Sequence, residues 1–270
     1  MDNRPIGVFD SGLGGLTSVK ELAALLPGED LVYFGDTARI PYGGRSADTI
    51  IRYGKEDIDF LLQKGVKAIL CACGTVSSTL PQALTDALPV PYVGVVAAAS
   101  AAAVAASRSG NIGLIATAAS VRSGSYERHV AALAPQARVT SNACPLLVPL
   151  IENGYVRRGD AITTAFVREY LAPVLAAGAD TLILGCTHYP IIADTIADVA
   201  GGGVTLVNSG SEGAKALCSL LRENDLLCGK PAGGKIDFYI SDSGENFAEI
   251  GGLFLGKDVH GTVHPFTLWD

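Results

Sequence analysis

Short, nearly uninterrupted apolar runs alternate with helix-like segments along most of the 270-residue chain. Strands are predicted at 6–9, 31–34, 68–73, 92–96, 111–116, 182–186, 205–207 and 237–240. Helices are predicted at 16–26 and 48–64, and an alanine-rich helix after residue 97. Apolar runs without polar alternation are typical of parallel strands that helices cover on both faces. The pattern therefore predicts an α/β fold with mainly parallel sheets.

Two landmarks recur in the same order in the two halves of the chain. Residues 6–11 (IGVFDS) resemble residues 112–117 (IGLIAT), and Cys73 is echoed by Cys186 at a similar spacing. Unless the likeness is a coincidence between common apolar strands, it predicts two similar lobes with the active site in the cleft between them. The chain after residue 207 is expected to return to the first lobe. The predicted lobes are then 1–96 plus 208–270, and 97–207.

The amino-acid composition limits which binding partners and which cellular compartment are expected for the protein. The chain is 49% hydrophobic and carries a net charge of −7, which argues against disorder and against nucleic acid or an anionic membrane as its partner. The weakly apolar stretch 90–106 is a poor membrane span because Pro91 breaks it, and no signal-peptide core precedes the first strand. Six scattered cysteines do not suggest a disulfide framework, so a cytoplasmic location is expected.

Two cysteines stand at predicted strand ends, each followed by small or polar residues. Cys73 precedes Gly74 and Thr75, and Cys186 precedes Thr187 and His188. A free thiol has a pKa of about 8.5, which a helix start or a nearby cation lowers to about 3.5–7.5. Matching thiols from two halves suggest one acid/base group on each side of a substrate carbon. The other four cysteines are expected to be buried structural residues: Cys71, Cys144, Cys218 and Cys228.

Two other readings of these motifs are weaker. Cys71, Cys73, Cys186 and His188 are formally four zinc ligands, but their spacing is unusual for a zinc site, and no metal is predicted. The glycine-rich turn at 10–15 can hold a carboxylate or phosphate on its backbone N–H groups. A dinucleotide site would need a third glycine where Thr17 stands.

Three further positions carry polar groups near these turns. The loop 35–45 is either an ordinary turn with a packed tyrosine or a specificity loop in which Tyr42 and the following N–H groups donate to a substrate. His188 stands two residues after Cys186, where it tunes that thiol or relays a proton. Glu152 follows an apolar run and either contacts His188 or is a solvated turn residue.

Three segments together resemble the cofactor-independent glutamate racemases of the aspartate/glutamate racemase superfamily. They are 7–15 (GVFDSGLGG), 35–39 (GDTAR) with 41–43 (PYG), and 185–190 (GCTHYP). The resemblance implies two flavodoxin-like lobes, L- or D-glutamate between them, no cofactor, and a homodimer that supplies D-glutamate for peptidoglycan, cell-wall biogenesis and cell shape.

The same resemblance implies roles for particular residues. Cys73 and Cys186 would be the acid/base pair of a two-base mechanism, with Asp10 assisting Cys73, and His188 with Glu152 assisting Cys186. The implied substrate contacts are Asp10, Ser11, Tyr42, Gly43, Thr75, Thr117, Thr187 and His188. Racemisation of aspartate or a related amino acid, and a non-catalytic amino-acid-binding module, remain the alternatives.

One position departs from the family. The residue after the first cysteine is usually Asn, and here it is Gly74, which offers only its backbone N–H to the substrate. A hydrogen bond to a charged group contributes about 1.5–3 kcal/mol. The sequence therefore predicts that Gly74→Asn lowers KM without changing the stereochemical course.

Overall fold

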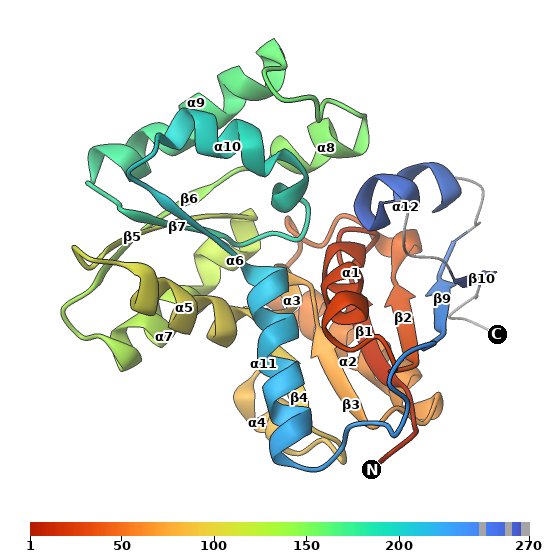
Figure 1. Cartoon of the computed structure of the whole chain (residues 1–270). Helices are drawn as coiled ribbons and strands as arrows, with labels where there is room; N and C mark the ends of the chain where they lie inside the picture. Colours follow the sequence, from red (N-terminus) through yellow and green to blue (C-terminus); the bar gives the residue numbers. More distant parts are fainter. Residues whose placement is uncertain (243–246, 257–260, 266–270) are drawn as a thin grey trace.

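Two parallel β-sheets organise the molecule (Figure 1). The computed structural model describes residues 1–242, 247–256 and 261–265. Within them the first sheet has the strand order β10 (Thr262–Pro265), β9 (Ile236–Ile240), β2 (Leu31–Gly35), β1 (Ile6–Asp10), β3 (Ala68–Cys71) and β4 (Tyr92–Gly94). The second has the order β6 (Arg138–Ala143), β5 (Asn111–Ala116), β7 (Thr181–Leu184) and β8 (Thr205–Asn208). Every pairing is parallel, which confirms the predicted fold class.

Both faces of the first sheet are covered, as its continuous apolar strands require. Ile6 and Val8 of β1 pack in one core with helices α1 (Leu16–Leu25) and α11 (Ser209–Glu223). Phe9, one residue further along, packs in a second core with helix α2 (Ala47–Gln63). Successive residues of a strand point to opposite faces, so β1 is buried over its whole length.

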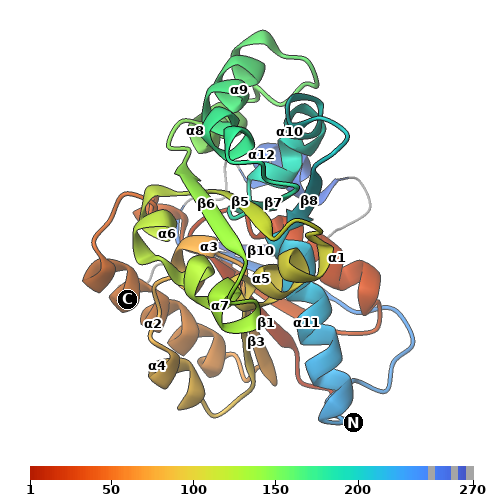
Figure 2. The ribbon, with the colours of Figure 1, turned by 90° about the vertical axis from the view of Figure 1, so that its left-hand side faces the viewer.

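The second sheet is covered in the same way. Figure 2 shows α9 (Ala161–Ala176) and α10 (Ala193–Ala200) on one side of it, and α5 (Val95–Ala106) and α7 (Ser125–Leu133) on the other. Figure 1 shows α11 running between the two sheets, and it packs against both α1 and α5. The largest core contains residues of both lobes, so the two sheets share buried contacts.

The shorter elements connect the sheets to their loops. They are η1 (Thr37–Arg39), α3 (Gly74–Ser77), α4 (Gln82–Asp86), α6 (Ala118–Ser123), α8 (Leu147–Glu152), η2 (Tyr189–Ile192) and α12 (Phe247–Leu255). No helix in the described ranges combines the length and the apolarity needed to cross a bilayer.

Several predicted boundaries need correction. The strand β3 ends at Cys71 rather than at residue 73, because Cys73 already caps α3. The strand β4 ends at Gly94, where α5 begins, and β7 ends at Leu184. The sheets draw their strands from 6–94 with 236–265 and from 111–208, an order compatible with the predicted return of the chain. The lobe boundaries at residues 96 and 207 stay a prediction.

Candidate active site

A cavity of about 460 Å³ lies where the carboxyl ends of the strands of both sheets meet. Such an edge is where open parallel sheets bind ligands, and the volume suits a small molecule. Its lining comes from loops of both lobes: Ser11, Gly12, Ile40, Pro41, Tyr42, Gly43, Gly44, Cys73, Gly74, Thr75, Thr117, Ala118, Cys144, Pro145, Val148, Pro149, Glu152, Cys186, Thr187 and His188.

All but one of the sequence-predicted site residues line this cavity. The exception is Asp10, which is almost completely buried and is not part of the lining. Its Oδ2 accepts a hydrogen bond from the Gly12 N–H at 3.0 Å, and its Oδ1 accepts one from Thr187 Oγ1 at 3.4 Å. Asp10 therefore lies beneath the residues that line the cavity. Its two hydrogen bonds connect the first loop to the loop of the second lobe that carries Thr187.

Cys73 presents its thiol from the first lobe. The residue caps α3, and its Sγ donates to Ser11 Oγ at 3.4 Å. Burial, and then the nearby Asp10 carboxylate, raise the pKa of Cys73 to about 12. This corrects the expectation that a helix start lowers the pKa of this thiol, because α3 has only four residues and the thiol is buried. Cys73 therefore holds its proton at neutral pH.

Cys186 lies in the second lobe beside a histidine and a glutamate. His188 Nδ1 is 3.7 Å from Cys186 Sγ, and its Nε2 is 3.0 Å from Glu152 Oε1 at the end of α8. Burial lowers the pKa of His188, but the hydrogen bonds to Cys186 and Glu152 outweigh it and raise that pKa to about 10. A protonated imidazole in this position stabilises negative charge as it develops on the sulfur.

The loop around Tyr42 is held from behind by buried charges. The Tyr42 hydroxyl donates to Asp36, and Arg39 bridges Asp36, Glu56 and Asp57. Tyr42 lines the cavity, but its hydroxyl is bound to Asp36. The buried carboxylate of Asp36 thus offers the phenol a partner inside the protein, as the packed-tyrosine alternative expects. A contact of Tyr42 with the substrate stays a prediction.

Several hydroxyl side chains line the cavity. Thr75 Oγ1 of the first lobe lies 2.9 Å from Thr117 Oγ1 of the second, and Thr117 also caps α6. Ser11 and Thr187 add two more hydroxyls. Among the described residues that line the cavity there is no lysine or arginine, so an anionic ligand would be held by hydroxyls, backbone N–H groups and the His188 ring.

Part of the wall was not predicted from the sequence. Two of these lining residues, Cys144 and Pro145, lie just before α8, and two others, Val148 and Pro149, lie inside it. Cys144 was expected to be structural, and it is buried, yet it faces the same cavity as Cys186. Burial, followed by the effect of Cys186, raises the pKa of Cys144 to about 12. Nothing in the local sequence separates it from an ordinary core cysteine.

The zinc alternative finds no geometric support in the described part of the chain. There, no three residues among His, Cys, Asp and Glu are grouped as a metal ion requires. Cys71 lies inside β3 and is not part of the cavity lining.

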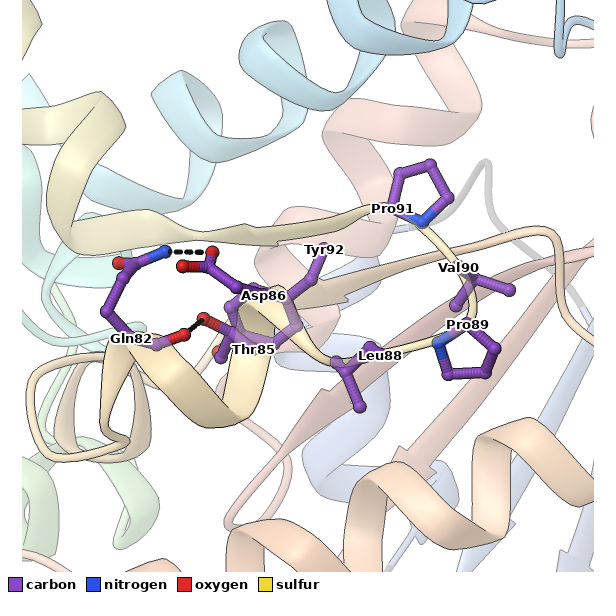
Figure 3. Close-up of a pocket in the computed structure, with 8 residues that line it drawn as sticks. All are labelled: Gln82, Thr85, Asp86, Leu88, Pro89, Val90, Pro91 and Tyr92. Carbon is purple, nitrogen blue, oxygen red and sulfur yellow. Dashed lines mark hydrogen bonds between the residues drawn. The ribbon is translucent and has the colours of Figure 1, made fainter.

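A second hollow lies beside α4, away from the thiols (Figure 3). It is lined by Gln82, Thr85, Asp86, Leu88, Pro89, Val90, Pro91 and Tyr92. The hydrogen bonds drawn there, from Gln82 to Asp86 and from Thr85 to Gln82, lie within one helical segment. None of the sequence-predicted site residues reaches this hollow.

Comparison with known proteins gives a consistent result. The profile of the family described as Asp/Glu/Hydantoin racemase matches residues 13–217. A glutamate racemase from Geobacter metallireducens is 42% identical over 265 residues, 98% of this chain and 97% of that protein. The crystal structure of a Francisella tularensis glutamate racemase in complex with D-glutamate has a TM-score of 0.91 and 38% identity, covering 100% and 99% of the chains. A Bacillus anthracis glutamate racemase isoform has a TM-score of 0.94 and 35% identity, covering 99% of each chain.

Proposed function

Because the chain belongs to the Asp/Glu/hydantoin racemase family, we propose that it interconverts L- and D-glutamate, with Cys73 and Cys186 as the two proton carriers. The observation that carries the proposal is that one cavity is lined by a buried thiol from each lobe. The Francisella structure, which holds D-glutamate and has nearly the same fold, supports glutamate as the substrate.

Proton movement follows from the unequal surroundings of the two thiols. In one direction, the Cys186 thiolate beside protonated His188 removes the α-proton of glutamate, and the Cys73 thiol gives its proton to the opposite face of the carbon. One C–H bond breaks and another forms, and the two sulfurs exchange protonation states. The reverse direction begins from the exchanged state.

Asp10 and Glu152 act on the thiols through their partners in this proposal. Asp10 disfavours negative charge on Cys73 and so keeps that thiol a proton donor. Glu152 keeps the His188 ring oriented and charged. A positioned acid or base contributes about 10²–10⁴-fold, so preorganised donors around the developing carbanion must supply much of the rest. The donors proposed for that task are the hydroxyls of Ser11, Thr75 and Thr117 and the backbone N–H groups at Gly43 and Gly74. Thr187, whose hydroxyl donates to Asp10, stays a predicted substrate contact.

The proposed cellular role follows from the product. D-glutamate serves peptidoglycan assembly, so we infer a cytoplasmic enzyme of cell-wall biogenesis that needs reduced thiols, because oxidised sulfur cannot carry a proton in this way.

A homodimer is proposed as well. In its support, Leu146, Tyr155 and Ile162 expose large apolar side chains, and Leu146 and Tyr155 belong to an apolar groove near the cavity. Analytical sedimentation of the wild-type protein would reveal a dimer. The same measurement on Leu146→Glu would reveal its disruption.

Chiral analysis tests the activity itself. Purified protein, treated with a chelator and with hydroxylamine to remove metal ions and carbonyl cofactors, is incubated with L-glutamate. We expect D-glutamate to accumulate until the enantiomers are equal. Faster inversion of L-aspartate would instead support the aspartate alternative, and saturable binding of glutamate without inversion would support a non-catalytic binding module.

A further inference from the structure

Two glycines meet across the cleft, and each is the chain neighbour of one of the thiols. Gly74 follows Cys73 in the first lobe, and Gly185 precedes Cys186 in the second. A Cβ atom on Gly74 would lie 2.3 Å from the carbonyl oxygen of Gly185 and 3.3 Å from its carbonyl carbon. The backbones of the two lobes are therefore in direct contact beside both sulfurs.

Gly185 has no room to move away from this contact. Its N–H donates to the Ile115 carbonyl at 2.8 Å. A Cβ atom on Gly185 would meet Leu114 Cδ1 at 2.8 Å and the Ala116 Cβ at 3.0 Å. The residue is thus wedged between β5 and Gly74. A side chain at position 74 would have to push the start of α3, and Cys73 with it, away from the second lobe.

Two other glycines of the first lobe face the second lobe. Comparing the three shows why a side chain is least tolerated at Gly74. A Cβ on Gly14 would meet the side chains of Thr187 and His188, and a Cβ on Gly43 would meet the side chain of Thr117. Those neighbours are side chains, which can rotate or shift. At Gly74 the obstacle is a backbone carbonyl fixed by a strand.

We propose that Gly74 is a positioning residue: its contact with Gly185 is the stop against which the two lobes close, and this stop sets the separation of the Cys73 and Cys186 sulfurs. The proposal rests on the proposed racemisation. In this chain the close backbone contact lies where the resembled family places an Asn side chain, so a side chain added here would have to displace that contact. The proposal and the sequence prediction expect different effects of Gly74→Asn: a lower kcat if the lobes are parted, and a lower KM if the amide reaches the substrate.

Kinetics of Gly74→Ala and Gly74→Asn test the proposal. A displacement of reacting groups by about 1 Å costs about 100-fold in rate, so we expect kcat to fall by about that factor while KM changes little. The primary isotope effect with α-deuterated glutamate should rise, because proton transfer becomes slower than product release. The matched control is Gly202→Ala, an exposed glycine at which a Cβ meets nothing within 4 Å, and it should keep wild-type kinetics.

A structure of Gly74→Ala gives a readout that does not depend on activity. We expect a longer distance between the two sulfurs than in wild type, with both lobes unchanged internally. Wild-type kcat or an unchanged sulfur separation would overturn the proposal. A variant that fails to fold would overturn it too, since the substitution should disturb the contact between the lobes and not the core of either. If wild type itself does not invert glutamate, the proposed function fails, and the sulfur separation still reports on the Gly74 contact.

Discussion

The two thiols proposed as proton carriers have different neighbours. Cys73 has the buried carboxylate of Asp10 near it, whereas Cys186 has the imidazole of His188, which Glu152 holds. A carboxylate disfavours a nearby thiolate, and a protonated imidazole favours it. The two proposed proton carriers therefore have different surroundings, and the proposed transfer uses them on opposite faces of the α-carbon.

Replacement of either thiol should stop inversion. In Cys73→Ser and Cys186→Ser the hydroxyl neither gives up nor takes a proton readily near neutral pH, so we expect the rate of inversion to fall by about 10²–10⁴-fold in each. Circular dichroism of glutamate follows the reaction. The matched control is Cys228→Ser, a half-buried cysteine outside the cavity, which should retain wild-type turnover. A single active-site variant with full activity would contradict the paired roles.

His188 should make stability depend on pH. Its pKa is raised from 6.5 to about 10 in the folded protein, so between these values the folded state binds a proton that the unfolded state releases. The stabilisation is full below pH 6.5 and is lost as the pH rises through about 10. We expect Tm to fall between about pH 6 and pH 9, and to fall less in His188→Asn. Parallel falls in both proteins would show that His188 does not hold the proton.

At the scale of the structural elements, the position of the loop that carries Tyr42 depends on the buried guanidinium group of Arg39. Arg39 contacts Asp36, Glu56 and Asp57, and it is the group that brings η1 against α2. Removing one partner of a buried ion pair costs about 3–5 kcal/mol, so Arg39→Met should lower the free energy of unfolding by about that amount. KM should rise as well, because this loop forms one wall of the cavity.

Urea unfolding and steady-state kinetics measure both effects of Arg39→Met. Arg52→Met is the control, because Arg52 is exposed and lies over the outer Tyr53 ring with its guanidinium 5.1 Å from the ring centre. An Arg39 variant as stable as the Arg52 variant would contradict the structural role of the cluster.

How well the elements could be predicted depended on their burial. Strands such as β1 and β5 lie inside their sheets, and their continuous apolar runs identified them. The strand β6, with the sequence RVTSNA, lies at an edge, is half-exposed and carries polar residues, so its pattern gives no clear signal. The strand β10 was missed for the same reason, since it also lies at a sheet edge.

The site could be predicted where motifs follow strand ends, and not where contacts arise from the tertiary arrangement. The thiols, Thr75 and His188 stand in such motifs. The position of Cys144 depends on β6 lying next to β5 in the sheet, which the local sequence does not encode. The contact between Gly74 and Gly185 joins residues of different lobes, and single-residue patterns carry no trace of it.

At the scale of the whole molecule, one buried ion pair lies at the end of the first sheet that is opposite to the cavity. Lys67 lies just before β3, and its fully buried Nζ contacts Glu29 Oε2 at 2.5 Å and the Asp2 carbonyl at 2.7 Å. The cavity lies beyond the other end of that strand. The ion pair therefore supports the fold without touching the site.

Lys67→Met separates the two properties. It leaves the Glu29 carboxylate buried without its cation, so we expect a loss of about 3–5 kcal/mol in the free energy of unfolding. The kcat and KM should stay at wild-type values at temperatures where the variant is folded. Adding Glu29→Gln should recover part of the stability. A changed KM in the single variant would contradict this separation.

Solvent deuterium provides the sharpest test of transfer between two thiols on opposite faces of the α-carbon. The reaction is started from pure L-glutamate in D₂O, and both enantiomers are isolated while little substrate has reacted. The experiment is then repeated from pure D-glutamate. We expect α-deuterium in the product enantiomer and almost none in the remaining substrate, in both directions, because the sulfur that removes the proton is not the one that delivers deuterium. Early deuterium in both pools, or a product that keeps the original α-proton, would contradict transfer between Cys73 and Cys186.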